Sequence, residues 1–267
     1  MDTVISDTLA ALMPYTMVRD GIVVFVGLVI SIGLHEFGHA AAAVWLGDPT
    51  PRHSSRLLQG RITDLGALLG VNRGLDNRYT LNPVAHADPI GTVVLPLFGL
   101  FLMPAGMLFG WGRPVPFNPN AARAKVSQQR MIVLVSLAGP LMNLLQFLAY
   151  SALLVGLLAL GLHNSKIELV AASVTWVKML LLLNLILAAF NLLPVPPLDG
   201  GHILVQTLRR SNPQWAQWLT QYGLFVLIFL LVLLPAIFAP VLAFGQAWTG
   251  WMGGHQVELQ LQPLIVL

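Results

Sequence analysis

The sequence predicts an all-α protein that spans a membrane several times. Of its 267 residues, 56% are hydrophobic and only 9% are charged, and the mean hydropathy is +0.76. A soluble domain carries about 25% charged residues, which it needs to cover its surface. The chain also contains several apolar runs of the roughly 20 residues that cross a bilayer as a helix. We therefore expect a polytopic helical membrane protein with about four to six transmembrane segments.

Four apolar runs are long enough to predict membrane helices. They are residues 21–46, 131–162, 169–208 and 222–244, and prolines and glycines interrupt the third at 191–201. We assign residues 21–252 to one domain, after a surface segment (1–20) and before a C-terminal tail (253–267). The first run lacks the basic start and small-residue cleavage site of a signal peptide, so we expect it to stay in the mature protein.

A fifth apolar run, residues 89–111, has an ambiguous pattern. It is long enough to cross the membrane, but Pro96 and Pro104 interrupt it. Proline removes a helical hydrogen bond and kinks a helix. The run therefore fits either a kinked span or a re-entrant hairpin that enters and leaves on one side.

The composition narrows the chemistry. The chain has no cysteine, so disulfides and thiolate metal sites are excluded, and any metal must be bound by His, Asp, Glu or Asn. The net charge of +3 comes from 14 Lys and Arg against 11 Asp and Glu. Because basic residues in membrane proteins mainly set orientation, we expect the lipid bilayer as a partner and no nucleic acid.

The five residues His35-Glu36-Phe37-Gly38-His39 lie inside the first apolar run. Residues four apart share a helix face, so both imidazoles point the same way, as two zinc ligands must. Glu36 lies beside them, placed to take a proton from a water on the metal. By composition alone this pattern is expected in about two of a thousand such chains. The alternative is a set of polar contacts between helices, although ionisable residues inside a membrane are costly and usually functional.

A catalytic zinc needs a third protein ligand and one open position. Glu36 and Asp199 are the two acidic residues deep in apolar runs. Asp199 follows two prolines and precedes two glycines, where the helix breaks and irregular backbone can line a cavity. We therefore predict one Zn²⁺ per chain, bound by His35, His39 and Asp199. The alternative role for Asp199 is to cap the helix that follows.

Three motifs in this order carry a resemblance: HEFGH at 35–39, AGPLMN at 138–143 and FNLLPVPPLDGGHIL at 190–204. The chain resembles the site-2 protease family of intramembrane zinc metalloproteases over residues 21–208. The segment GWGRPVPFNP at 110–119 is similar to the short bacterial branch of that family, which lacks a PDZ domain.

The resemblance implies a fold, an activity and individual roles. It implies three core helices around the zinc, in a bacterial inner (plasma) membrane protein. It implies an endopeptidase that cuts peptide bonds in or near transmembrane helices of substrate proteins, with the three ligands named above and Glu36 as general base. It further implies that Asn191 and Asn143 contact the substrate or the developing oxyanion.

Three other polar residues lie near these motifs. His202 follows the glycine pair and either approaches the zinc or supports a ligand from behind. His86 and Asp88 lie at a predicted membrane edge, where they either touch the metal or anchor the chain. The sequence predicts neither the oligomeric state nor the substrate.

The depth of the ligands constrains the topology. The two histidines lie in the C-terminal half of their helix, and Asp199 lies near the C-terminal end of its run. To share one zinc, the two helices must run in the same direction. With one antiparallel helix between them, residues 89–111 must then begin and end on one side, as a hairpin.

The basic residues give a second argument for this topology. Eleven fall in the loops on one side: Arg52, Arg56, Arg61, Arg73, Arg78, Arg113, Arg123, Lys125, Arg130, Arg209 and Arg210. The other side carries Arg19 and Lys166. The positive-inside rule therefore predicts that these loops and the mouth of the active site face the cytoplasm.

Two other functions fit some of the same residues. A transporter or channel uses intramembrane His and Glu as a proton or metal pathway. A catalytically inactive membrane scaffold is the second alternative, but it has no need of a base beside two metal ligands. Tight binding of one zinc distinguishes the enzyme from the transporter, which binds a transported metal weakly.

Overall fold

The computed structural model describes residues 15–52, 77–102 and 110–252. Within these ranges the regular elements are helical, apart from one isolated antiparallel bridge between Ala87 and Gly112. The prediction of an all-α fold is confirmed. The predicted tail (253–267) and most of the predicted surface segment (1–20) lie outside the described residues, and the first described helix begins at Tyr15.

Three helices of the described part are long and apolar enough to cross a membrane: α2 (Tyr15–Trp45), α7 (Gln128–Ala159) and α8 (Glu168–Asn191). At 1.5 Å per residue even the shortest is about 36 Å long, which exceeds the roughly 30 Å hydrocarbon core. Leu141, Leu145 and Leu148 lie exposed on one face of α7, as expected for contact with lipid. The chain is thus a multi-pass membrane protein.

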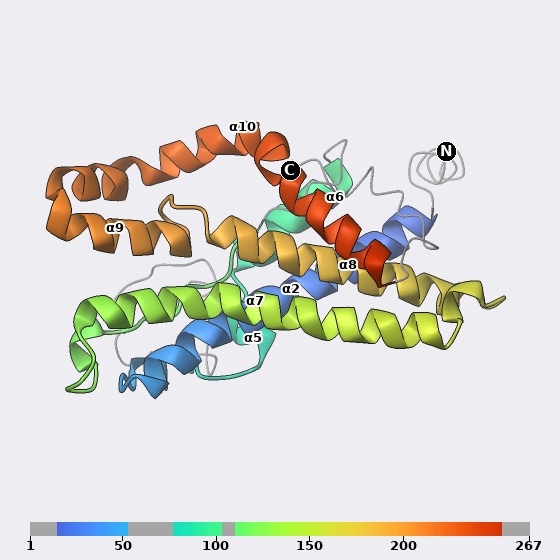
Figure 1. The fold of residues 1–267 in the computed structure, drawn as a ribbon, viewed down its shortest axis with the longest axis horizontal. Helices are drawn as coiled ribbons and strands as arrows, with labels where there is room; N and C mark the ends of the chain where they lie inside the picture. The colour runs from blue at the N-terminus through green and yellow to red at the C-terminus, as the bar shows by residue number, and fades with distance from the viewer. Residues whose placement is uncertain (1–14, 53–76, 103–109, 253–267) are drawn as a thin grey trace, which may run out of the picture.

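The remaining elements connect or cover these spans. They are η1 (Thr50–Arg52), α5 (Pro83–His86), the π-helix η2 (Pro89–Val94), α6 (Leu95–Leu102), η3 (Pro119–Ala121), η4 (Leu162–Asn164), α9 (Asp199–Ser211) and α10 (Pro213–Trp251). The predicted interruption of the third apolar run separates α8 from α9. Helix α10 turns back beside α9 and then passes over α8 (Figure 1).

Helix α7 runs antiparallel to α2. As α7 advances from Val135 to Asn143, its hydrogen-bond partners on α2 go back from His39 to His35. Close approach of the two helices depends on small residues, because a Cβ at Gly38 would lie 2.7 Å from the carbonyl oxygen of Ala138. Such small-residue contacts are the usual way in which membrane helices pack tightly.

Helices α2 and α8 run in the same direction, as the ligand-depth argument required. Near their N-termini, Arg19 donates to Glu168 over 2.7 Å, and the indole of Trp176 donates to Asp20 over 2.8 Å. The Arg19 guanidinium also lies 5.4 Å from the centre of the Trp176 ring. This polar cluster fixes the register of the two helices at the end far from the histidines.

The run at residues 89–111 begins and ends at the same place. The amide of Trp111 donates to the carbonyl of Gly91 over 3.1 Å, and the Thr92 hydroxyl donates to the Trp111 carbonyl over 2.7 Å. The bridge between Ala87 and Gly112 extends this pairing. Residues 103–109 lie outside the described part. The adjacency of both ends agrees with the predicted re-entrant hairpin, which stays a prediction.

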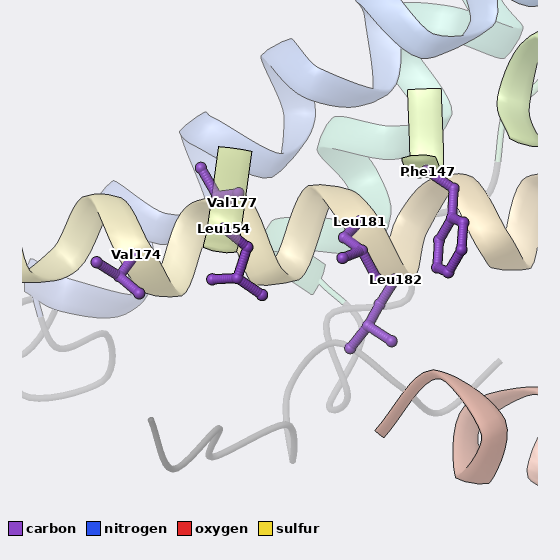
Figure 2. Packing of buried hydrophobic residues seen from close by; sticks show 6 residues of the cluster. All are labelled: Phe147, Leu154, Val174, Val177, Leu181 and Leu182. Atoms are coloured by element: carbon purple, nitrogen blue, oxygen red, sulfur yellow. The ribbon is translucent and has the colours of Figure 1, made fainter. Parts of the chain in front are cut away.

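The apolar core between α7 and α8 lies toward the end of the bundle far from the histidines. Figure 2 shows its buried members: Phe147, Leu154, Val174, Val177, Leu181 and Leu182. Lipid tails are as apolar as leucine, so these contacts hold the helices together mainly through van der Waals packing. Because the core fixes α8 against α7, it also fixes where the chain turns toward Asp199.

Candidate metal centre

The structure brings His35, His39 and Asp199 together. The histidines lie one turn apart on α2, and Asp199 is the first residue of α9. Their potential ligand atoms all lie within 4.8 Å of one another, and all three side chains are largely buried. The cluster found among the described residues is therefore the ligand set that the sequence predicted. Its members come from two helices and are more than 150 positions apart in the sequence.

The distances in this cluster match those around a tetrahedral zinc. The two Nε2 atoms are 3.1 Å apart, and they lie 3.2 Å (His35) and 3.4 Å (His39) from the Asp199 carboxylate oxygens. Zinc bonds of about 2.0–2.1 Å in tetrahedral geometry place neighbouring ligand atoms about 3.3 Å apart. The side chains are therefore spaced to hold one such ion.

Hydrogen bonds from α7 set which nitrogen of each imidazole faces the cluster. Nδ1 of His39 donates to the Val135 carbonyl over 2.7 Å, since a carbonyl only accepts. Nδ1 of His35 lies 2.6 Å from Oδ1 of Asn143, whose Nδ2 donates to Asn184. Each neutral ring has one N–H, so both Nε2 atoms present lone pairs toward the cluster.

Three electron-rich groups thus face one another over hydrogen-bonding distances. Oδ2 of Asp199 is buried and accepts no hydrogen bond. A buried anion of this kind is costly unless a cation compensates it. The donor set of two imidazoles and one carboxylate suits zinc and leaves a fourth position open.

Gly139 leaves the space beside the two Nε2 atoms open. A Cβ at this position would lie 2.6 Å from Nε2 of His35 and closer still to Nε2 of His39. The backbone of α7 therefore passes directly over the two ligand atoms, and any side chain there would point into the space between them. This role was not predicted from the sequence, although Gly139 belongs to the AGPLMN motif.

A chain of buried amides supports His35 from behind. Asn143 on α7 bonds to His35 and to Asn184 on α8, and Asn184 in turn donates to the Ser31 hydroxyl on α2 over 3.0 Å. The first and last members of the chain both lie on α2, so three helices share one polar network. Partners of this kind fix the orientation of a metal-binding imidazole. Sequence patterns gave no sign of the pairing between Asn143 and Asn184.

Glu36 lies next to the ligand cluster but is not part of it. Its charge lies within electrostatic range of His35, His39 and Asp199. A Cβ at Gly112 would lie 3.0 Å from Oε1 of Glu36, so the extended segment after the hairpin passes close to this carboxylate. The carboxylate therefore lies between the cluster and an extended stretch of backbone.

The loop between α8 and α9 folds tightly against the helix that carries Asp199. A Cβ at Gly200 would overlap the backbone of Leu192, and one at Gly201 would overlap the backbone of Val195. Glycine at both positions lets the loop close onto the first turn of α9. No side-chain hydrogen bond caps this helix, so the Asp199 carboxylate, at its first position, is directed to the histidines instead.

Comparison with known proteins places the chain in a family. The model for peptidase family M50 matches residues 23–234. The chain belongs to peptidase family M50. This confirms the resemblance to site-2 proteases and the prediction of a zinc metalloprotease, and it means that the substrates are proteins.

Individual relatives agree with the family match. The M50 chain is 32% identical to "Putative zinc metalloprotease YwhC" of Bacillus subtilis, over 83% of this chain and 82% of the relative. It is 31% identical to "Putative zinc metalloprotease Rip2" of Mycobacterium tuberculosis, over 87% of this chain and 71% of that protein. The Rip2 of Mycolicibacterium smegmatis is 28% identical, over 84% and 71%. No solved structure shows a significant match to the chain.

The structure also shows the surroundings of the other predicted polar residues of the M50 chain. Asn191 ends α8, and its Nδ2 donates to the Leu187 carbonyl over 3.0 Å. Asp88 accepts from the amides of Ile90 and Gly91, so it caps the π-helix and anchors the chain, one of the two roles considered for it. His202 is exposed on the first turns of α9.

His86 has a structural environment of its own. Its ring is fully buried, its Nε2 donates to the Thr80 carbonyl over 2.9 Å, and its Nδ1 has no partner. Burial lowers the pKa of this imidazole, so it is neutral at pH 7. It is not a member of the ligand cluster found among the described residues.

Substitution of Gly139 by Ala tests the geometry of the centre. The added methyl group would occupy the space between the two Nε2 atoms, so we expect zinc affinity to fall at least about tenfold, as when groups that orient ligands are lost. Competition with a zinc chelator, followed by metal analysis of the purified protein, measures this.

Gly156→Ala is the matched control, because it lies in the same helix with open space around its Cβ. It should keep the zinc affinity of the wild type. Equal zinc retention by both variants would show that α7 does not pass over the metal.

Proposed function

We propose that this M50 protein is an intramembrane zinc endopeptidase, which hydrolyses peptide bonds in or near transmembrane segments of other proteins. The observation that carries the proposal is the convergence of three lone-pair donors with Glu36 beside them, on helices long enough to span a bilayer. One zinc per chain is held by His35, His39 and Asp199. When bound, zinc supplies the Lewis acidity that makes water nucleophilic at neutral pH and polarises a carbonyl.

Glu36 acts as the general base. It belongs to the same turn of α2 as the histidine ligands but is left out of the cluster, so its carboxylate is available for proton transfer. It accepts a proton from the attacking water and returns it to the leaving amine. The oxygen of the water adds to the carbonyl carbon, and the C–N bond breaks afterwards as the adduct collapses and the nitrogen takes up the proton from Glu36.

Asn191 and Asn143 are the proposed substrate contacts. An amide N–H donor near the developing oxyanion stabilises the transition state by about 3 kcal/mol in other hydrolases. Asn191 is half-buried at the end of α8, immediately before the loop that leads to Asp199. Asn143 already uses its amide group for His35 and Asn184, so its contribution is expected mainly through the position of His35.

The environment of the site determines the class of substrate. A cluster between membrane helices is reached most readily by another membrane segment, which supports transmembrane helices as substrates. A stable helix satisfies its own backbone hydrogen bonds and hides its peptide groups. We therefore expect substrates to carry residues that weaken the helix near the cut, so that a short stretch unwinds before attack.

Glu36→Gln tests the assignment of the base. The amide cannot accept the proton, so cleavage should fall by about 10²–10⁴-fold while zinc content stays at the wild-type level. Quantitative proteomics compares membranes from cells that carry the wild type or the variant, and it identifies the uncleaved membrane segments that accumulate with the variant. The cleavage rate is then measured with purified protein and one of these segments. A variant that loses no activity, or that loses its zinc, would overturn the role of Glu36 as base.

We also propose that the basic loops and the active-site mouth face the cytoplasm, in the bacterial inner membrane. The segment after the hairpin meets α2 beside Glu36, on the histidine side of the bundle, whereas Arg19 pairs with Glu168 at the opposite end. The loops on the histidine side carry eleven basic residues, and the other side carries two. The positive-inside rule places the side with more basic residues in the cytoplasm.

Single cysteines test this orientation without background, because the native chain has none. Leu81→Cys and Lys125→Cys, at exposed positions on either side of the hairpin, should resist a membrane-impermeant thiol reagent in intact cells and react after permeabilisation. Lys166→Cys, at the other end of the bundle, should react in intact cells. If the positions before and after the hairpin label from opposite sides, the segment crosses the membrane and the proposed topology is wrong.

A further inference from the structure

The turn between α9 and α10 forms a groove away from the metal centre. It has a volume of about 410 Å³ and is lined by Arg209, Pro213, Ala216, Gln217, Thr220 and Gln221. This volume lies within the range of about 300–1,000 Å³ that is usual for small-molecule sites. The groove is formed by the last turn of α9 and the first turns of α10, which pack as an antiparallel pair (Figure 1).

The groove has a positive charge that the neighbouring sequence does not compensate. Arg209 lines it, Arg210 follows, and residues 200–257 contain no Asp or Glu. The preceding acid, Asp199, lies ten residues back along α9, about 15 Å away, and belongs to the metal cluster. The other polar lining groups are amides and a hydroxyl, so the groove favours an anion.

Aromatic residues indicate the depth of the groove in the membrane. Trp215, Trp218 and Tyr222 form a ladder along α10, with ring centres 5.7 and 5.6 Å apart, and all three are exposed. Tryptophan and tyrosine collect at the level of lipid headgroups. The same face continues with Phe225 and Phe229, each 67% exposed, as expected where headgroups give way to acyl chains.

We propose that this groove binds the phosphate of an anionic phospholipid. Arg209 pairs with the phosphate, and Gln217 and Gln221 donate to its oxygens or to the glycerol. A lipid source is favoured over a free phosphate because the aromatic ladder, on the opposite face of α10, places these turns at the level of the lipid headgroups.

Titration of the zinc-loaded, detergent-solubilised protein with phosphatidylglycerol, followed by native mass spectrometry, tests the site. Arg209→Gln should weaken phosphatidylglycerol binding about fivefold, the effect of one basic residue near an anionic surface. Arg210→Gln is the matched control, since it removes the same charge one residue away, from a side chain outside the groove lining. It should bind within about twofold of the wild type, on the same scale.

Two further arms separate the sources of the anion. Phosphatidylcholine should bind the wild type more weakly than phosphatidylglycerol, and inorganic phosphate should not displace the bound lipid at equal concentration. An equal loss in both arginine variants would overturn the site, because the attraction would then be general. Displacement by phosphate, or no preference for the anionic lipid, would also overturn it. Zinc content of each variant confirms that the fold is intact.

Discussion

Two imidazole nitrogens and a carboxylate face one another within 3.4 Å at the centre of this protein, and a bound cation would offset their mutual repulsion. Without one, the lone pairs repel and the Asp199 carboxylate is buried without a sufficient partner. Hydrogen bonds from Val135 and Asn143 prevent either ring from turning its N–H inward. The surrounding helices therefore hold three lone-pair donors in the positions that a metal ion needs.

The arrangement of the helices follows from this requirement. Ligands from α2 and α9 reach the same depth because α2 and α8 run in one direction, with α7 antiparallel between them. The α7 backbone can pass over the ligands because position 139 has no side chain. The buried amide chain through Asn184 then joins all three spans by polar contacts, which supplement the weak apolar preference between helices in lipid.

Much of this site could be predicted from the sequence because its signals are local. The spacing of His35 and His39 within one helix, and the break before Asp199, are visible within a few residues. The shared direction of the two ligand helices followed from the need for equal depth, and the adjacency of Gly91 and Trp111 agrees with the hairpin that this direction required.

The features that could not be predicted depend on contacts between distant segments. Nothing local distinguishes Gly139 from Gly156 in the same helix, yet one lies against the ligands and the other has open space around it. The pairing of Asn143 with Asn184 likewise exists only once α7 and α8 are packed. Asp88 fitted two roles from its position alone, and the geometry of the following π-helix shows it as a cap.

X-ray absorption at the zinc edge, on the purified wild-type protein, tests the central claim most directly. The account predicts one zinc per chain, a first shell of about four nitrogen and oxygen atoms near 2.0–2.1 Å, and the multiple scattering of two imidazoles. In Asp199→Ala the shell should lose its carboxylate and the zinc affinity should fall, whereas Asp88→Ala should be unchanged. A six-coordinate oxygen shell, a single imidazole, or an unaltered spectrum in Asp199→Ala would contradict the ligand set.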